Sequence, residues 1–272
     1  MFRFAQHDRY AVRSNPLNRY GKGEANESAY VYRKQRTYST MKTKLHVIRT
    51  KNFVIDAADF ILEQAHKAIG KRNEFRIALS GGNTPRPVYA RLAAPGHDLP
   101  WDLIRITFGD ERCVPPNDPE SNFRMARETL LGPAAVPEKS ILRMRGEIDP
   151  QIAAQEYEDQ LDLMARQHNE PIYRHDLILL GLGDDGHTAS LFPGTAALEE
   201  TTRRVVANFV PKLSAWRLTF TFPLINQARQ ILFLVGAAKN PGLIERVLEG
   251  DQQLPAARVN PSAGEVTWMI GE

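Results

Sequence analysis

The sequence has one cysteine, Cys113, and no apolar run that approaches the roughly 20 residues a membrane-spanning helix needs. A single cysteine excludes an intramolecular disulfide framework and a zinc site built from several thiolates, and it suits a reducing compartment. The missing apolar run excludes an integral membrane protein built from helices. We therefore expect a cytoplasmic protein with no membrane partner.

Residues 41–272 lack an excess of positive charge. The 272-residue chain has a formal net charge of +3, but residues 1–40 hold eight Lys and Arg against three acidic residues and so carry about +5. Residues 41–272 therefore carry about −2. Because the basic excess does not belong to the globular part, we expect no nucleic-acid partner.

Residues 1–40 also lack apolar periodicity, which predicts disorder. Their arginine content resembles a mitochondrial transit peptide, but Asp8, Glu24 and Glu27 argue against one. The alternative is that Met41 is the natural start. We expect a disordered or spurious extension over residues 1–40 and a single α/β domain over residues 41–272, which no Pro/Gly/Ser-rich linker divides.

From residue 41 onward, short apolar runs alternate with segments of helical periodicity. Strands are expected at residues 45–48, 76–79, 104–108, 141–144, 176–180, 205–210, 218–222, 231–235 and 265–270. Helices are expected at residues 54–69, 85–92, 122–131 and 150–167, and after Asn240-Pro241. This alternation predicts a three-layer α/β/α Rossmann-like domain with a mostly parallel central sheet.

Ligands of such a domain bind beyond the carboxyl ends of the strands, and the first unusual strand end is rich in glycine and hydroxyl groups. Glycines let the backbone approach a ligand closely, and the free N–H groups can cradle an anion. The alternative is an ordinary tight turn between strand and helix. The candidate phosphate-binding residues are Ser80, Gly81, Gly82, Asn83 and Thr84.

The second strand end carries three consecutive charges, Asp110, Glu111 and Arg112. Such charges are costly to bury unless they pair with one another or meet a ligand. The alternative is an ion-pair cluster on the surface. Cys113, which follows them, has no evident base nearby and is expected to be a small packed side chain.

The third strand end, residues 181–193, begins with the spacing GxGxxG. A dinucleotide is not expected, because Asp184 and Asp185 stand where a pyrophosphate needs bare amides. His187, held among glycines beside Asp185, can instead take a proton from water, and a carboxylate on its other nitrogen would fix its tautomer. The alternative is a structural histidine that caps a turn. Metal ligation has little support, because no histidine pair has ligand spacing, and the absence of a GxSxG elbow argues against a serine hydrolase.

Taken in order, these segments resemble the 6-phosphogluconolactonase family over residues 45–270. The resemblance implies a fold like that of the glucosamine-6-phosphate deaminase and ribose-5-phosphate isomerase relatives. It also implies hydrolysis of 6-phospho-D-glucono-1,5-lactone to 6-phospho-D-gluconate in the oxidative pentose phosphate pathway. The motifs that carry it are LSGGNTP at residues 79–85, FGDER at 108–112, PESN at 119–122, the block at 181–193, RLT at 217–219 and GAAK at 236–239.

Carried over residue by residue, the resemblance implies that His187 is the base that activates water, with Asp185 as its neighbouring carboxylate. Arg112 is then a cation near the reacting carbonyl, while the glycine-rich turn at residues 81–84, Arg217 and Lys239 become phosphate- or substrate-binding candidates. We expect no metal and no cofactor, a phosphosugar lactone as the small-molecule partner, and a monomer or weak homo-oligomer.

The alternative enzyme is a glucosamine-6-phosphate deaminase or isomerase. That family follows its histidine with a phenylalanine-asparagine-glutamate run, where this chain has Ala189-Ser190-Leu191-Phe192. A phosphosugar-binding regulator on the same fold would need a DNA-binding module, and the tail has no helix-turn-helix pattern.

Overall fold

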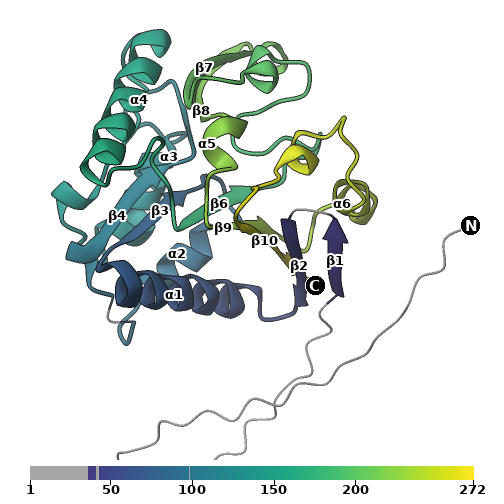
Figure 1. Cartoon of the computed structure of the whole chain (residues 1–272), viewed down its shortest axis with the longest axis horizontal. Coiled ribbons are helices and arrows are strands. Elements are labelled where there is room, and N and C mark those ends of the chain that lie inside the picture. The colour runs from purple at the N-terminus through teal and green to yellow at the C-terminus, as the bar shows by residue number, and fades with distance from the viewer. Residues whose placement is uncertain (1–35, 41–42, 98) are drawn as a thin grey trace, which may run out of the picture. The chain divides into compact units, whose positions relative to one another are not determined.

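A seven-stranded sheet forms the centre of the fold (Figure 1). The structure, a computed structural model, describes residues 36–40, 43–97 and 99–272. Only the edge pair β1–β2 is antiparallel, and every other pair in this sheet is parallel. Across the sheet the strands are β1 (Arg36–Thr40), β2 (Thr43–Thr50), β10 (Glu265–Gly271), β9 (Gln230–Val235), β6 (Leu177–Gly181), β3 (Phe75–Leu79) and β4 (Ile104–Phe108).

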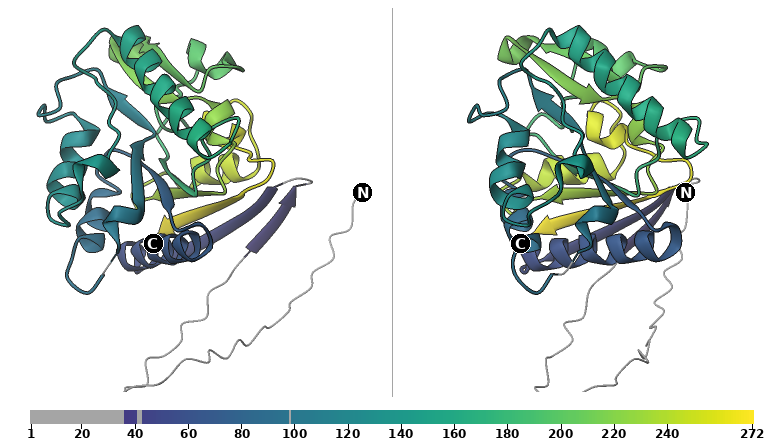
Figure 2. Two further views of the ribbon diagram at one scale, coloured as in Figure 1. Left: turned by 60° about the vertical axis from the view of Figure 1, so that its left-hand side comes forward. Right: turned by 90° about the vertical axis from the view of Figure 1, so that its left-hand side faces the viewer.

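Helices cover both faces of this sheet, as the two views in Figure 2 show. In β6, Leu177 and Leu179 enter one buried apolar cluster, and Ile178 and Leu180 enter the other, as the period-2 alternation of a strand requires. The first cluster contains α1 (Phe53–Arg72), α2 (Arg86–Leu92) and α3 (Asn122–Ala126). The second contains α4 (Pro150–Gln167), α5 (Phe222–Ile225) and α6 (Pro241–Leu248). The predicted α/β/α class is confirmed.

A second, antiparallel sheet has the order β5 (Asp110–Arg112), β8 (Ala215–Phe220) and β7 (Val205–Val210). Only Gly109 separates β4 from β5, so the chain passes directly from the carboxyl end of the main sheet into the small one. The hydroxyl of Tyr157 on α4 accepts a hydrogen bond from the N–H of Phe108 at 2.9 Å, just before this transfer. The small sheet is thereby placed beside the carboxyl ends of the parallel strands.

Most predicted elements occur within two or three residues of their expected bounds, and the differences are local. Residues 141–144 were expected to form a strand, which is wrong: they contribute one isolated bridge, from Ile141 to Ile106. The predicted helix at residues 122–131 is α3 followed by a wider π-type turn at Arg127–Leu131. The single-turn 3₁₀ segments are Trp101–Leu103, Glu138–Ser140, Ala196–Glu199, Pro211–Leu213 and Pro255–Arg258.

The expected N-terminal extension lies mostly outside the described residues. Its last five residues form β1, which pairs with β2 from Arg36 opposite Val47 to Thr40 opposite Thr43. The strand pairing therefore begins earlier than residue 41, where the sequence placed the start of the domain. Within the described residues, no helix is both long enough and apolar enough to cross a membrane.

Candidate active site

The three strand ends singled out in the sequence meet around one cavity of about 400 Å³. It lies at the carboxyl ends of β3, β4 and β6, where the small sheet joins them. The predicted site residues that line it are Ser80, Gly81, Gly82, Asn83, Thr84, Arg112, Asp185, His187 and Arg217. Lys239 is not among the lining residues.

The loop after β6 is shaped by glycines that leave room for an imidazole. The N–H of Gly183 donates to the carbonyl of His187 at 2.8 Å and closes a tight turn. A Cβ added at Gly183 would lie 2.0 Å from the His187 ring, and Gly186 has a φ of +80°. Gly183 is therefore needed for close approach and Gly186 for a left-handed backbone.

His187 is fixed by a carboxylate and by an aromatic ring. Its Nδ1 lies 2.5 Å from Oδ1 of Asp185, and its ring stacks on Phe192 with centroids 3.9 Å apart. The ammonium of Lys212 donates to Oδ2 of the same carboxylate at 3.0 Å. Partial burial opposes the ionisation of Asp185, but the hydrogen bonds from His187 and Lys212 lower its pKa to about 2. The carboxylate is therefore ionised at neutral pH.

This arrangement assigns the tautomer of His187. An ionised carboxylate can only accept, so Nδ1 of the neutral ring carries the proton and Nε2 holds the free lone pair. In the described part of the chain, Nε2 has no hydrogen-bond partner, and the residue lines the cavity. The geometry is that of a histidine oriented to accept a proton from a molecule inside the cavity.

Two arginines face each other across the small sheet beside this histidine. Arg112 on β5 and Arg217 on β8 are direct partners in the antiparallel register. The guanidinium groups donate to backbone carbonyls, of Glu120 and Trp216 respectively, and neither forms an ion pair with a carboxylate of residues 36–40, 43–97 or 99–272. Burial, and next the charge of Arg112, lower the pKa of Arg217. Two adjacent positive charges that pair with no carboxylate of the described residues are suited to an anion.

Two hydrogen bonds to the Tyr89 hydroxyl fix the glycine-rich turn after β3. The hydroxyl of Tyr89 accepts from the N–H of Ser80 at 3.0 Å and donates to its carbonyl at 2.8 Å. Gly82 has a φ of +91°, and a Cβ at Gly81 would lie 1.8 Å from the Asn122 side chain. The turn is thus fixed with its backbone at the cavity wall.

Asp110 and Asn122 join the three strand ends and were not proposed as site residues from the sequence. Asn122 donates to Oδ1 of Asp110 at 3.2 Å, and the hydroxyl of Ser190 donates to its Oδ2 at 2.7 Å. All three line the cavity. These three residues could have been proposed from the sequence, because each lies inside a motif that the sequence analysis already singled out.

Glu111, the middle charge of its triplet, has a structural role. Only 2 % exposed, it accepts hydrogen bonds from the N–H groups of Arg112, Asn122 and Phe123 and from the hydroxyl of Ser121. Burial raises its pKa, although these bonds oppose the rise. Glu111 therefore connects β5 to the start of α3. This structural role accounts for one of the three consecutive charges, and no ligand is needed to explain it.

Two lysines lie near the site in ways that the sequence did not predict. Lys239 donates to Oδ1 of Asp184 at 2.6 Å, so the nearest partner of this phosphate candidate is a carboxylate. Lys212 was missed, because no local pattern connects it with Asp185, 27 positions earlier. Within the described segments, no group of three or more His, Cys, Asp or Glu is arranged to hold a metal ion.

Comparisons with known proteins identify the family of the chain. Residues 49–268 match the family model described as glucosamine-6-phosphate isomerases/6-phosphogluconolactonase. A 6-phosphogluconolactonase from Synechocystis sp. is 43% identical over 237 residues, which is 85% of this chain and 97% of the relative. One from Nostoc sp. is 37% identical over 85% of this chain and 96% of the relative.

Solved structures show the same fold. A 6-phosphogluconolactonase from Thermotoga maritima aligns with a TM-score of 0.74 and 26% identity, over 84% of this chain and all of that one. The enzyme of the same name from Trypanosoma brucei aligns with a TM-score of 0.73 and 29% identity, over 86% of this chain and 97% of that one. The chain therefore belongs to the 6-phosphogluconolactonases, within the family that they share with the glucosamine-6-phosphate isomerases.

Proposed function

We propose that this protein hydrolyses 6-phospho-D-glucono-1,5-lactone to 6-phospho-D-gluconate, a step of the oxidative pentose phosphate pathway, with His187 as the general base. The observation that carries the proposal is the 2.5 Å contact between Nδ1 of His187 and Asp185, at the wall of a cavity that also holds two arginines without carboxylate partners. The names of the relatives supply the substrate class.

The chemistry requires a base and a positioned water. The water oxygen forms a bond to the lactone carbonyl carbon while its proton passes to Nε2 of His187. The bond from that carbon to the ring oxygen then breaks, and the imidazolium returns a proton to the ring oxygen. Asp185 remains ionised throughout and stabilises the charged imidazolium. A general base of this kind typically contributes about 10²–10⁴-fold to the rate.

The two arginines divide the remaining work. A phosphate carries nearly two negative charges, and a guanidinium group can donate two parallel hydrogen bonds to its oxygens. We assign Arg217, with the turn at residues 80–84, to phosphate binding, and Arg112 to the oxygen that becomes negative at the reacting carbonyl. Binding energy from the phosphate then orients the lactone ring toward His187.

The test is hydrolysis of freshly prepared phosphogluconolactone by purified wild-type protein and by His187→Asn, followed as acid release. We expect His187→Asn to fold, to bind 6-phosphogluconate, and to lose at least about 100-fold in kcat. Asp185→Asn should lose activity in the same direction, because a neutral amide does not stabilise the imidazolium and its NH2 group can favour the wrong tautomer of His187. Exchange of His66, an exposed histidine on α1, for Gln serves as the matched control and should leave kcat unchanged.

Two outcomes would overturn the proposal. Near-normal turnover by a folded His187→Asn protein would show that His187 is not the general base. Release of ammonia from glucosamine 6-phosphate, without acceleration of lactone hydrolysis, would instead assign the other activity named in the family description.

A further inference from the structure

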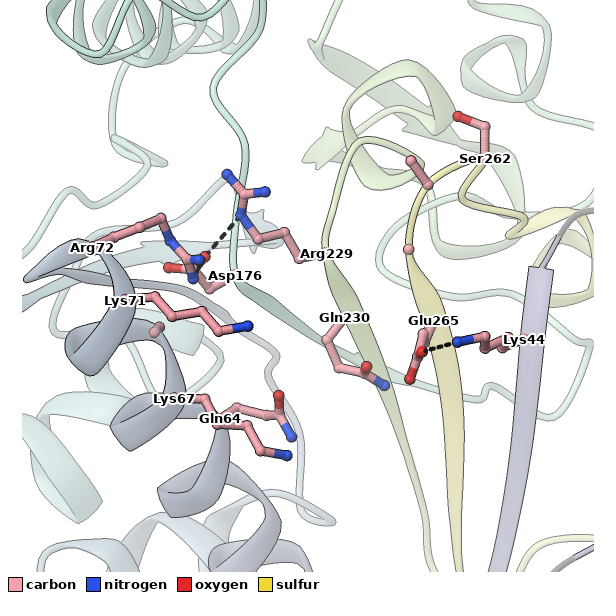
Figure 3. Close-up of a pocket in the computed structure, with 13 residues that line it drawn as sticks. Lys44, Gln64, Lys67, Lys71, Arg72, Asp176, Arg229, Gln230, Ser262 and Glu265 are labelled. Carbon is pink, nitrogen blue, oxygen red and sulfur yellow. Dashed lines mark hydrogen bonds and ion pairs between the residues drawn. The ribbon is translucent and has the colours of Figure 1, made fainter.

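A second cavity, of about 620 Å³, lies at the opposite ends of the parallel strands (Figure 3). Its walls are the last two turns of α1, the first residues of β9 and β10, and the loop at residues 262–264. Asp176, at its floor, directly precedes β6, whereas Gly181 at the other end of β6 begins the His187 loop. Five residues of strand span about 17 Å, so the two cavities are separate.

The walls of this second cavity carry an excess of positive charge. Two carboxylates, Asp176 and Glu265, face five cationic side chains, for a net charge of +3 from the lining. The residues beyond the first 40 carry about −2 in total, so the cavity concentrates charge of the opposite sign to the body around it. The cations are Lys44, Lys67, Lys71, Arg72 and Arg229.

Most of these cations pair with a carboxylate, and two of the pairs reach carboxylates outside the cavity lining: Lys67 with Glu63 at 2.7 Å and Arg229 with Glu170 at 3.6 Å. Arg72 and Arg229 both donate to the same oxygen, Oδ1 of Asp176, at 2.6 Å and 3.1 Å. Lys44 pairs with Glu265 at 3.2 Å. Lys71 has no carboxylate partner among the residues that the structure describes, and Figure 3 shows its side chain extending from α1 toward the strand wall. One carboxylate oxygen thus accepts hydrogen bonds from two guanidinium groups.

The requirements of the fold do not account for this arrangement. Lys71 and Arg72 stand in the last turn of α1, where cations are favourable to the helix dipole. Lys44 and Arg229, however, come from the strand side of the cavity, and their charges repel those on the helix. Asp176, whose side chain is only 5% exposed, fixes two guanidinium groups rigidly. Preorganised cations around a hollow space favour an anion.

The lining also defines the kind of anion. It contains no aromatic side chain, so no surface is available for a nucleobase to stack on. Gln64, Gln230 and Ser262 supply neutral hydrogen-bonding groups suited to hydroxyls. The volume greatly exceeds the roughly 30 Å³ of one water molecule, and it falls within the size range of small-molecule sites.

We propose that this cavity is a second anion-binding site, separate from the His187 cavity, for a small non-aromatic polyanion. The ligand lies between Lys67 and Lys71 on α1 and Arg229 on the strand wall. Binding there is independent of catalysis, because the cavity shares no lining residue with the active-site cavity.

The experiment is calorimetric titration of the full chain with inorganic pyrophosphate, which requires no turnover and therefore does not depend on the proposed function. We expect the double variant Lys67→Ala/Lys71→Ala to weaken pyrophosphate binding by about 10-fold or more, as the loss of two charge-assisted contacts predicts. Both side chains are on the helix surface, so the variant should keep the melting temperature of the wild type.

Two controls make the result specific. Lys139→Ala removes an exposed lysine far from the lining of either cavity and should leave pyrophosphate binding unchanged. Arg217→Ala should leave the same binding site occupied, because it alters only the His187 cavity. Unchanged pyrophosphate affinity in the double lysine variant, or its loss in Arg217→Ala alone, would overturn the proposal.

Discussion

Single charged residues in the His187 cavity are stabilised in opposite ways. The Asp185 carboxylate accepts hydrogen bonds from His187 and Lys212 and is held ionised. Arg112 and Arg217 have only backbone carbonyls as partners, and their charges oppose each other. A folded protein keeps such a pair when a bound anion completes it. The two arginines therefore keep positive charge that an anion could neutralise, whereas the charge of Asp185 is already balanced by its donors.

The division between the two arginines is testable with two lactones. We expect Arg217→Ala to reduce kcat/KM for phosphogluconolactone by roughly 10- to 150-fold, the equivalent of about 1.5–3 kcal/mol for a hydrogen bond to a charged group. The same variant should hardly affect unphosphorylated gluconolactone. Arg112→Ala should lower kcat/KM for both lactones, because the developing oxyanion is common to them.

The quantity to compare is the ratio of kcat/KM for the two lactones, in each variant and in the wild type. A ratio that stays at the wild-type value in Arg217→Ala means that Arg217 does not bind the phosphate. If the ratio changes only in Arg112→Ala, then Arg112 binds the phosphate and Arg217 lies at the reacting carbonyl.

How far the sequence predicts the site depends on whether a residue's role is local. His187 and Asp185 are two positions apart, so their contact could be expected from the sequence, and the structure places them 2.5 Å apart. Lys212 could not be found, since its contact with Asp185 depends on how β7, β8 and the turn between them pack. Glu111 was grouped with two possible ligand-binding charges, because its hydrogen bonds to α3 are visible only once the helix is in place.

Among the elements, those with strong periodicity are predictable and those fixed by pairing are not. The bounds of α4, β4 and β7 agree with the sequence prediction, because each has an apolar pattern of the right period. β5 has only the residues Asp-Glu-Arg and no pattern, and it is a strand because it pairs with β8. Conversely, residues 141–144 have a strand-like composition but only one bridging partner. Tertiary pairing decides such short segments.

The last residue of β6 and the loop that follows it offer a matched pair of glycine substitutions. Gly183→Ala would place a Cβ 2.0 Å from the His187 ring, so the imidazole must move away from its position beside Asp185. At Gly181 an added Cβ meets no atom within 4 Å, and the backbone does not need a positive φ. We expect Gly183→Ala to lower kcat at least about 10-fold while the protein stays folded, and Gly181→Ala to remain near wild type.

Steady-state kinetics on both variants, with circular dichroism to confirm the fold, check this prediction. Equal kcat values for the two alanine variants would show that the imidazole does not depend on the close approach of Gly183.

At the scale of the whole molecule, the parallel sheet separates two kinds of chemistry. Its carboxyl ends carry the cavity lined by His187 and the arginine pair, and its amino ends carry the lysine-rich cavity. β6 connects them, with His175 and Asp176 just before its first residue and Gly181 at its last. The stability of this central strand therefore affects both sites.

His175 gives that stability a pH dependence. It is 1 % exposed, its Nε2 lies 2.9 Å from the hydroxyl of Thr107, and its Nδ1 is buried without a hydrogen-bond partner among the residues that the structure describes. Burial, and next the charge of Arg76, lower its pKa to about 3. In the unfolded chain a histidine has a pKa of about 6.5. Between these values the unfolded state binds a proton that the folded state does not, so stability is full above pH 6.5 and falls as the pH decreases.

We expect this one residue to contribute a loss of up to about 1.4 kcal/mol of unfolding free energy per pH unit once the pH is well below 6.5. The measurement is denaturant unfolding between pH 7.5 and pH 5, in wild type and in His175→Gln, which keeps an N–H donor but cannot be protonated. The variant should lose stability less steeply over this range, while exchange of the exposed His66 for Gln should leave the slope as it is. NMR of the histidine ring nitrogens in the folded wild type at pH 5 gives an independent check, since His175 should remain neutral there. A protonated His175 in the folded protein at that pH, or equal slopes in wild type and His175→Gln, would contradict the buried neutral state.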